Sequence, residues 1–235
     1  MNFKGAPDPP ETIVPYLREA LLKWGRENLR DFPWRRTRDP YRVLLSEMLL
    51  QRTRAAQAVP VYEELIRRYP SVFELSRAEP DGLERILAPL GLRWRIPLIR
   101  EMAGQVVERH GGRIPADRKQ LLSLPGVGDY AASAVLSFAF NFPEPVLDAN
   151  TVRLTGRLFG IEVTESSRRS RGLRELVAGL VDREHPRLFN YAFLDVASTI
   201  CRPGKPVCGA CPVAEICYHY AEAKKRDSGR EAAGD

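Results

Sequence analysis

The sequence predicts an all-α protein, because helical periodicity and spaced prolines recur along it and no strand pair does. From Asp39 onward, a residue suited to a helix N-cap precedes a proline and apolar residues at helical intervals, in a segment that continues to Val59. Prolines such as Pro60 and Pro143 bound segments of helical length, and no alternating strands with a hairpin turn lie between them. Short helices joined by tight turns are expected to pack into a compact helical protein.

Length and composition are typical of a globular protein with one large or two small domains. The 235 residues are 44% hydrophobic and 28% charged, and no apolar stretch is long enough for a membrane span. The formal net charge of +6 and the pI near 9.3 make nucleic acid a candidate partner, although charge alone is weak evidence. No targeting segment is visible, so a cytoplasmic protein associated with the chromosome is expected. Residues 218–235 are polar and are predicted to form a disordered tail.

All four cysteines fall within one short segment, at the spacing C-x6-C-x2-C-x5-C, and are the candidate metal ligands Cys201, Cys208, Cys211 and Cys217. Four thiolates satisfy the ligand number of a 4Fe-4S cluster or of a structural zinc site. Zinc modules commonly place their ligands as two close pairs, whereas this segment has one tight pair, Cys208 and Cys211. The spacing therefore favours a loop wrapped around a cluster. Two disulfides are the alternative, and they are typical of small secreted domains.

A second informative stretch runs from Leu121 to Tyr130, where two glycines flank a valine between apolar helices. Such a turn leaves backbone N–H groups uncovered at the start of the following helix, where they can bind a DNA phosphate. The alternative is a structural corner in which glycine only avoids a clash. The candidate phosphate-binding residues are Leu124, Gly126, Val127 and Gly128.

The hairpin residues Leu124–Gly128 (LPGVG), the segment Val146–Asn150 (VLDAN) and the four-cysteine loop together resemble the helix-hairpin-helix DNA glycosylases of the endonuclease III superfamily. Phe32–Arg35, Leu45–Glu47 and the Arg-Pro-Gly-Lys-Pro run of the cysteine loop belong to the same pattern. The resemblance covers about residues 30 to 217, which is nearly the whole chain.

The resemblance implies two helical domains that flank a DNA-binding cleft. It places a six-helix barrel with the hairpin at residues 31–144, and an iron-sulfur cluster domain at residues 1–30 and 145–217. It also implies a 4Fe-4S cluster held by the four cysteines, and a monomer whose partner is double-stranded DNA with a mismatched or damaged base.

Asp148 is the candidate catalytic carboxylate. Cleavage of an N-glycosidic bond builds positive charge on the sugar, and a carboxylate beside it stabilises the oxocarbenium-like transition state. Because Asp148 begins a predicted helix, a structural role as its N-cap is the alternative, and both roles can hold together. The family pattern favours catalysis.

Glu47 is the second candidate carboxylate, since a charged residue within an apolar helix is uncommon unless it is partnered or functional. It could donate a proton or position water. The alternative is a place on the polar edge of that helix, near Arg54 or Lys23. The resemblance implies a catalytic glutamate at this point in the mismatch-specific glycosylases.

Tyr130 predicts the reaction type. In the bifunctional members of the family this position is a lysine, whose amine forms a Schiff base that permits strand cleavage. Tyrosine cannot form that imine. We therefore expect a monofunctional glycosylase that leaves an abasic site, with Tyr130 near the reacting sugar.

Two subfamilies differ in the base that they remove. Arg52, Ala55 and the Asp-Ala-Asn of residues 148–150 resemble the thymine or uracil type, whereas Tyr191 matches neither type. The short segment after Cys217 favours the same reading, because adenine glycosylases usually continue into a further domain. We expect flipping and hydrolytic removal of a mispaired thymine or uracil (T:G, U:G), with adenine opposite 8-oxoguanine or guanine as the runner-up.

Five side chains are candidate DNA contacts. Arg52 is expected to enter the space left by the flipped base or to contact the orphan guanine, because arginine pairs well with guanine acceptors; a phosphate contact is the alternative. Gln51 and Asn150 belong to the same motifs. Arg202 and Lys205 of the cysteine loop are expected to supply salt-dependent affinity.

Two tryptophans and one rival class complete the predictions. Trp34 is expected in the core, and Trp94, between two arginines, on the surface. The rival class is a non-catalytic iron-sulfur DNA-binding protein of the same fold, in which the carboxylates are structural.

Overall fold

The computed structural model describes residues 12–91 and 93–231, and the regular structure in these ranges is helical, without any strand. The predicted all-α class is therefore confirmed. No helix within the described ranges is long and apolar enough to cross a membrane. The protein divides into two compact units, one formed by Asp31–Phe142 and the other by the segments that flank it, up to Arg30 and from Pro143 onward.

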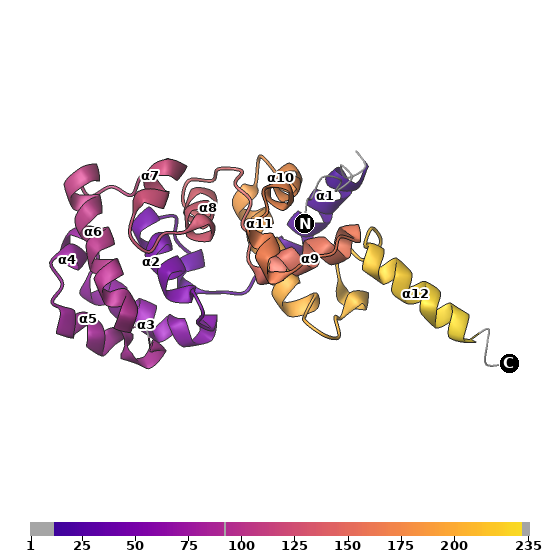
Figure 1. The fold of residues 1–235 in the computed structure, drawn as a ribbon, viewed down its shortest axis with the longest axis horizontal. Coiled ribbons are helices and arrows are strands. Elements are labelled where there is room, and N and C mark those ends of the chain that lie inside the picture. The colour runs from indigo at the N-terminus through magenta and orange to yellow at the C-terminus, as the bar shows by residue number, and fades with distance from the viewer. Residues whose placement is uncertain (1–11, 92, 232–235) are drawn as a thin grey trace. The chain divides into compact units, whose positions relative to one another are not determined.

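The first unit, Asp31–Phe142, is a bundle of helices around α2 (Figure 1). Its elements are η1 (Pro33–Arg35), α2 (Pro40–Leu50), α3 (Ala55–Arg68), α4 (Val72–Ser76), α5 (Pro80–Leu87), η2 (Ala88–Leu90), η3 (Arg93–Arg95), α6 (Ile96–His110), α7 (Arg118–Ser123) and α8 (Asp129–Phe138). Asp39 caps α2 by accepting hydrogen bonds from the backbone N–H groups of Tyr41 and Arg42, at 2.8 and 3.2 Å. α2 packs against α3 and α8, and its residues 43–49 are buried.

The predicted helical segment from Asp39 to Val59 is interrupted in the structure, which is a correction. α2 ends at Leu50 and α3 begins at Ala55, because Arg52 takes a left-handed backbone conformation with φ of 60°. Pro60 lies inside α3 and does not bound it. Proline has no N–H group, so the carbonyl of Ala56, four residues before Pro60, has no helical hydrogen-bond partner. Both residues are exposed, so water can hydrate that carbonyl. Trp34 is 3% exposed and makes an edge contact with Tyr62, which confirms its core position.

The second unit has its own apolar core. Its elements are α1 (Ile13–Asn28), α9 (Ala149–Phe159), η4 (Glu165–Arg169), α10 (Arg171–Leu180), α11 (Pro186–Asp195), the π-helical turn η5 (Val196–Ile200), η6 (Cys208–Ala210) and α12 (Tyr218–Glu231). α1 and α11 pack closely, because a Cβ on Gly25 would lie only 3.0 Å from the Cβ of Ala192. The fully buried carboxylate of Asp195 accepts a hydrogen bond from the Arg30 guanidinium at 2.7 Å and from its backbone N–H at 2.9 Å.

The segment after Cys217 corrects the prediction of a disordered tail. Tyr218–Glu231 forms α12, which projects beyond the other helices of its unit in Figure 1, and residues 232–235 lie outside the described residues. The segment is rich in Ala, Glu and Lys, which favour helices. The Tyr218 ring lies against Gly160, where an added Cβ would approach it to 2.8 Å. Propensity and this contact together explain the order.

Candidate functional site

The hairpin joins α7 to α8 through a turn at residues 124–128. The N–H of Val127 donates to the carbonyl of Leu124 at 3.1 Å, and Gly126 has φ of +76°, which favours glycine. The side chains of Leu124 and Val127 are buried, at 3% and 6% exposure, so only their backbone could reach a ligand. Gly128 is the N-cap of α8 and has no side chain with which to cap it, which leaves the first amides of α8 available to an anion.

Tyr130 lies in the first turn of α8 and is half-buried. It therefore follows the hairpin directly, in the position that the sequence predicted. Its phenol is a hydrogen-bonding group without the amine that a Schiff base requires.

Glu47 lies on α2 and is 3% exposed. The alternative of a place on a polar edge is wrong, because the neighbouring positions 43–49 are buried on every side of this helix. Such burial of a carboxylate costs free energy unless its environment compensates for it. Glu47 thus has the burial that a functional carboxylate is expected to show.

The residues after α2 form a tight turn. Gln51 is the C-cap of α2, and its side-chain amide donates to the carbonyl of Gly126 in the hairpin at 3.3 Å. Arg52 is exposed and follows in the left-handed conformation. Trp94 is 57% exposed, which confirms its surface position, whereas Arg95 beside it is only 2% exposed. Sequence reasoning missed Arg95, because a single arginine in an Arg-Trp-Arg run carries no periodic signal of burial.

In the second unit, Asp148 is the N-cap of α9. Its carboxylate accepts hydrogen bonds from the backbone N–H groups of Asn150 and Thr151 at 2.9 and 2.7 Å, and from the Asn150 side-chain amide at 2.8 Å. The hydroxyl of Thr151 accepts from the N–H of Asp148 and completes a capping box. The capping alternative is thus confirmed. These donors fix the orientation of a carboxylate that is still half-exposed and can meet a substrate.

Asn150 is held on both sides of its amide. Its nitrogen donates to Asp148, and its oxygen accepts from Arg153 at 3.0 Å. Arg153 also donates to the carbonyls of Ala197 and Cys201, at 2.8 and 2.9 Å. Asn150 therefore orients Asp148, and this local role was not foreseen when it was predicted as a DNA contact.

The four cysteines are free thiols that line one small cavity. This result removes the disulfide alternative. The wall is otherwise mainly apolar and is lined by Leu154, Arg157, Ile200, Pro206, Ala214, His219 and Tyr220. In the described residues, no three His, Cys, Asp or Glu side chains converge closely enough to hold one metal ion. Four thiolates suit a 4Fe-4S cluster or a structural zinc ion, and the single tight pair, Cys208 and Cys211, favours the cluster.

Burial raises the pKa values of the thiols, most clearly that of Cys211, to about 11, and also those of Cys208 and Cys217. At neutral pH these thiols are protonated unless a cation stabilises the thiolates. Binding of a metal centre here would release protons.

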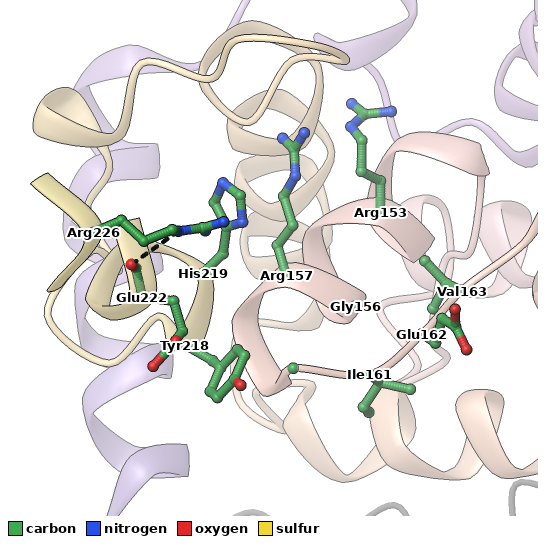
Figure 2. A pocket seen from close by; sticks show the side chains of 11 residues that line it. Arg153, Gly156, Arg157, Ile161, Glu162, Val163, Tyr218, His219, Glu222 and Arg226 are labelled. Atoms are coloured by element: carbon green, nitrogen blue, oxygen red, sulfur yellow. Dashed lines mark hydrogen bonds between the residues drawn. The ribbon is translucent and has the colours of Figure 1, made fainter. Parts of the chain in front are cut away.

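Arg157 fixes the cysteine loop. Its guanidinium donates to the carbonyl of Arg202 at 2.8 Å and to the Cys201 Sγ at 3.4 Å. Figure 2 shows Arg153 and Arg157 on the same face of α9, with His219 of α12 beside Arg157. They border an open pocket of about 550 Å³, but the two guanidinium groups already bind carbonyls. Arg202 and Lys205 are exposed on the loop, as an electrostatic role requires.

Comparisons with known proteins agree with these features. The family profile described as "HhH-GPD superfamily base excision DNA repair protein" matches residues 45–178. The thymine/uracil-DNA glycosylase of Pyrobaculum aerophilum is 42% identical over 217 residues, covering 88% of this chain and 93% of that protein. The adenine DNA glycosylase of Homo sapiens is 35% identical over 87% of this chain, but this match spans 39% of the human protein.

A solved structure of a thermostable thymine-DNA glycosylase has a TM-score of 0.83 at 32% identity, covering 90% of this chain and 98% of that one. The similarity predicted from the hairpin, the VLDAN segment and the cysteine loop is confirmed, including its order, with thymine/uracil enzymes ahead of adenine enzymes. The chain belongs to the HhH-GPD superfamily of base excision DNA repair proteins.

Proposed function

We propose that this protein is a monofunctional DNA glycosylase that flips a thymine or uracil mispaired with guanine and hydrolyses its N-glycosidic bond, leaving an abasic site. The observation that carries the proposal is Asp148, a half-exposed carboxylate held in one orientation by three donors. The similarity to thymine/uracil-DNA glycosylases over 88% of the sequence supports the choice of base. A mispaired base costs less to flip than a paired one, which favours mismatches as substrates.

Asp148 supplies electrostatic stabilisation. As the glycosidic bond lengthens, positive charge develops on the sugar, and a fixed carboxylate stabilises it without reorganising. The capping hydrogen bonds of Asp148 are made before the substrate arrives, so the enzyme is preorganised for this step.

Glu47 and Tyr130 have supporting roles. A buried carboxylate such as Glu47 can protonate the departing base or position the attacking water. Tyr130 follows the hairpin with a phenol in place of an amine, which supports hydrolysis without a Schiff base.

We propose that Cys201, Cys208, Cys211 and Cys217 hold a 4Fe-4S cluster. Four free thiols around one largely apolar cavity support this assignment. When bound, the cluster would supply four iron atoms that cross-link the loop, and no open coordination site for water. Arg157 would hold the loop in place, and Arg202 and Lys205 would remain exposed for DNA phosphates.

The DNA interface of the first unit follows from the hairpin. The uncapped amides at the start of α8 suit a phosphate, and Arg52 is exposed beside them on the turn that Gln51 links to Gly126. Phosphate contacts fix register, and an arginine that reads guanine supplies specificity. In this interface the hairpin amides would bind the DNA backbone, and Arg52 would recognise the base opposite the flipped one.

The test is an excision assay with duplexes that contain T:G, U:G, A:G and A:8-oxoguanine. We expect alkali-labile sites at thymine and uracil opposite guanine. Excision of adenine alone would establish the runner-up, which the similarity to adenine glycosylases supports. Binding to all four duplexes without any alkali-labile site would establish a non-catalytic DNA-binding protein.

A further inference from the structure

Arg95 is a buried arginine with an unusual set of partners. It is 2% exposed, and its two terminal nitrogens donate to the backbone carbonyls of Met48 and Gln51. Its guanidinium also lies over the Trp94 ring, 4.6 Å from the centroid. Arg95 therefore spans from the start of α6 to the end of α2.

The carbonyls that Arg95 binds belong to Met48, in the last turn of α2, and to Gln51, the C-cap of that helix. Carbonyls in this position have no partner within the helix, and the helix end carries partial negative charge. A planar arginine fork presents two terminal nitrogens in fixed directions, one to each carbonyl, whereas a lysine has a single ammonium nitrogen on a flexible stem. The guanidinium of Arg95 thus caps the C-terminal end of α2 and is attached to the residue before Arg52.

Arg52 needs such an anchor. Its φ of 60° is unfavourable for a residue with a side chain and persists only where the surroundings hold it. Gln51 is held on two sides, by Arg95 at its carbonyl and by Gly126 at its side-chain amide. Fixing Gln51 determines the direction in which the next residue leaves the helix.

The hairpin belongs to the same rigid block. A Cβ on Gly126 would lie 3.0 Å from the Met48 Cε and 3.4 Å from the Leu98 Cβ, so the turn packs on α2 and α6. The turn that carries Arg52 and the hairpin turn proposed to bind phosphate are therefore connected through Arg95, Gln51 and Met48.

The charge of Arg95 points the same way. Burial and, to a smaller extent, the nearby charge of Arg52 lower the pKa of Arg95. Two neighbouring cations repel each other, which favours an outward position for the exposed Arg52 side chain. Guanine acceptors or a phosphate would compensate this charge.

We propose that Arg95 is a positioning residue for opposite-base selectivity: it fixes the turn that presents Arg52 to the orphan guanine. This inference rests on the proposed function. It assigns to Arg95 an effect on the preference for U:G over U:A, and none on hydrolysis itself.

The first test is single-turnover excision by Arg95→Met and Arg52→Ala, separately and combined. Arg95→Met is expected to lower the U:G to U:A rate ratio about tenfold, mainly through U:G, because one arginine–guanine contact discriminates by about that factor. The double variant is expected to lose no more than Arg52→Ala alone. Equal losses on both duplexes, or additive losses in the double variant, would overturn the inference.

Two further variants distinguish the hydrogen-bonding geometry of Arg95 from its positive charge and from the nonspecific effect of removing an arginine. Arg95→Lys keeps the charge but has one nitrogen in place of the two that bind the carbonyls of Met48 and Gln51, so a reduced ratio is expected. A wild-type U:G to U:A rate ratio in Arg95→Lys would show that the two-nitrogen geometry of the guanidinium is not required. Arg67→Met changes an exposed arginine of α3 that pairs with Glu64, and is expected to leave the ratio unchanged.

A protease test needs no enzymatic activity, so it separates failure of this inference from failure of the proposed function. Trypsin cleavage after Arg52 and Arg54, identified by mass spectrometry, is expected to be at least about fivefold faster in Arg95→Met than in Arg67→Met, because the turn opens more often. Unchanged cleavage at these two bonds would overturn the role of Arg95, whatever base the enzyme removes.

Discussion

The two units hold their functional residues by different means. In the first unit, Glu47 and the base of the Arg52 turn belong to a packed helical core, and the order of the site follows from apolar burial. In the second, residues 201–217 contain little regular structure, and the loop is held by Arg157 and by thiols around a cavity. The first site can therefore form from the polypeptide alone, whereas the proposed cluster would complete the second.

Asp148 combines both means, because it caps a regular helix and is also linked to the cysteine loop. It is the cap of an ordinary helix, but Arg153 connects its partner Asn150 to the carbonyl of Cys201. The carboxylate proposed to be catalytic thus receives its orientation from a helix end and shares a hydrogen-bond network with the cysteine loop. A change in the helix cap and a change in the cysteine loop should therefore affect different parts of the second unit.

Removing one thiol should produce the largest effect, because it should loosen the cysteine loop of the second unit and leave the packed core of the first unit unchanged. Cys211→Ser is expected to lower the bound iron and to speed hydrogen exchange throughout residues 201–217, while exchange in α2 stays unchanged. Iron analysis and hydrogen-exchange mass spectrometry are the measurements. Ala210→Ser, an exposed neighbouring change, is the control. Full iron content in Cys211→Ser would remove that residue from the ligand set.

Asp148→Asn should separate catalysis from folding in the second unit. Asparagine also caps helices well, so the melting temperature is expected to stay nearly constant. Loss of the negative charge is expected to slow base release about a thousandfold, with DNA affinity retained. Single-turnover kinetics and a binding titration test this pair of results. Activity near that of the parent protein would show that the carboxylate is only a cap.

The sequence predicted the second unit's site more fully than the first's. The four cysteines and the VLDAN segment are local signals, and the structure places the thiols around one cavity and Asp148 at the N-cap of α9. The break at Arg52 and the capping by Arg95 depend on residues more than forty positions apart, from α2 to η3, and no local pattern carries them. The order of α12 depends on the contact of Tyr218 with Gly160, which is also tertiary.

Glu47→Gln probes the buried carboxylate of the first unit. We expect a decrease in the excision rate of about ten- to a hundredfold, because a neutral amide cannot exchange a proton with the base or water. The rate should also lose part of its pH dependence. Full activity with an unchanged pH profile would assign Glu47 to structure alone. Gln is nearly isosteric, so stability should change little.

The smallest effect concerns the hairpin glycines, which form a matched pair. Gly126→Ala forces a side chain into φ of +76° against Met48, and should destabilise the first unit by about 1–2 kcal/mol and weaken DNA binding. Gly128→Ala, at φ of −97° with open space around it, should have little effect on stability. Thermal melting and DNA titration compare the two. Equal melting temperatures would mean that the turn relaxes freely.

The central claim is hydrolytic removal of a mispaired pyrimidine without strand cleavage. It is tested most directly by mass spectrometry of a T:G duplex after incubation with the whole protein and without alkali. We expect a full-length strand in which a hydroxyl group from water replaces thymine on that sugar, with the other hydrogen of water released on the free base. A cleaved strand, or a covalent adduct after borohydride treatment, would contradict it.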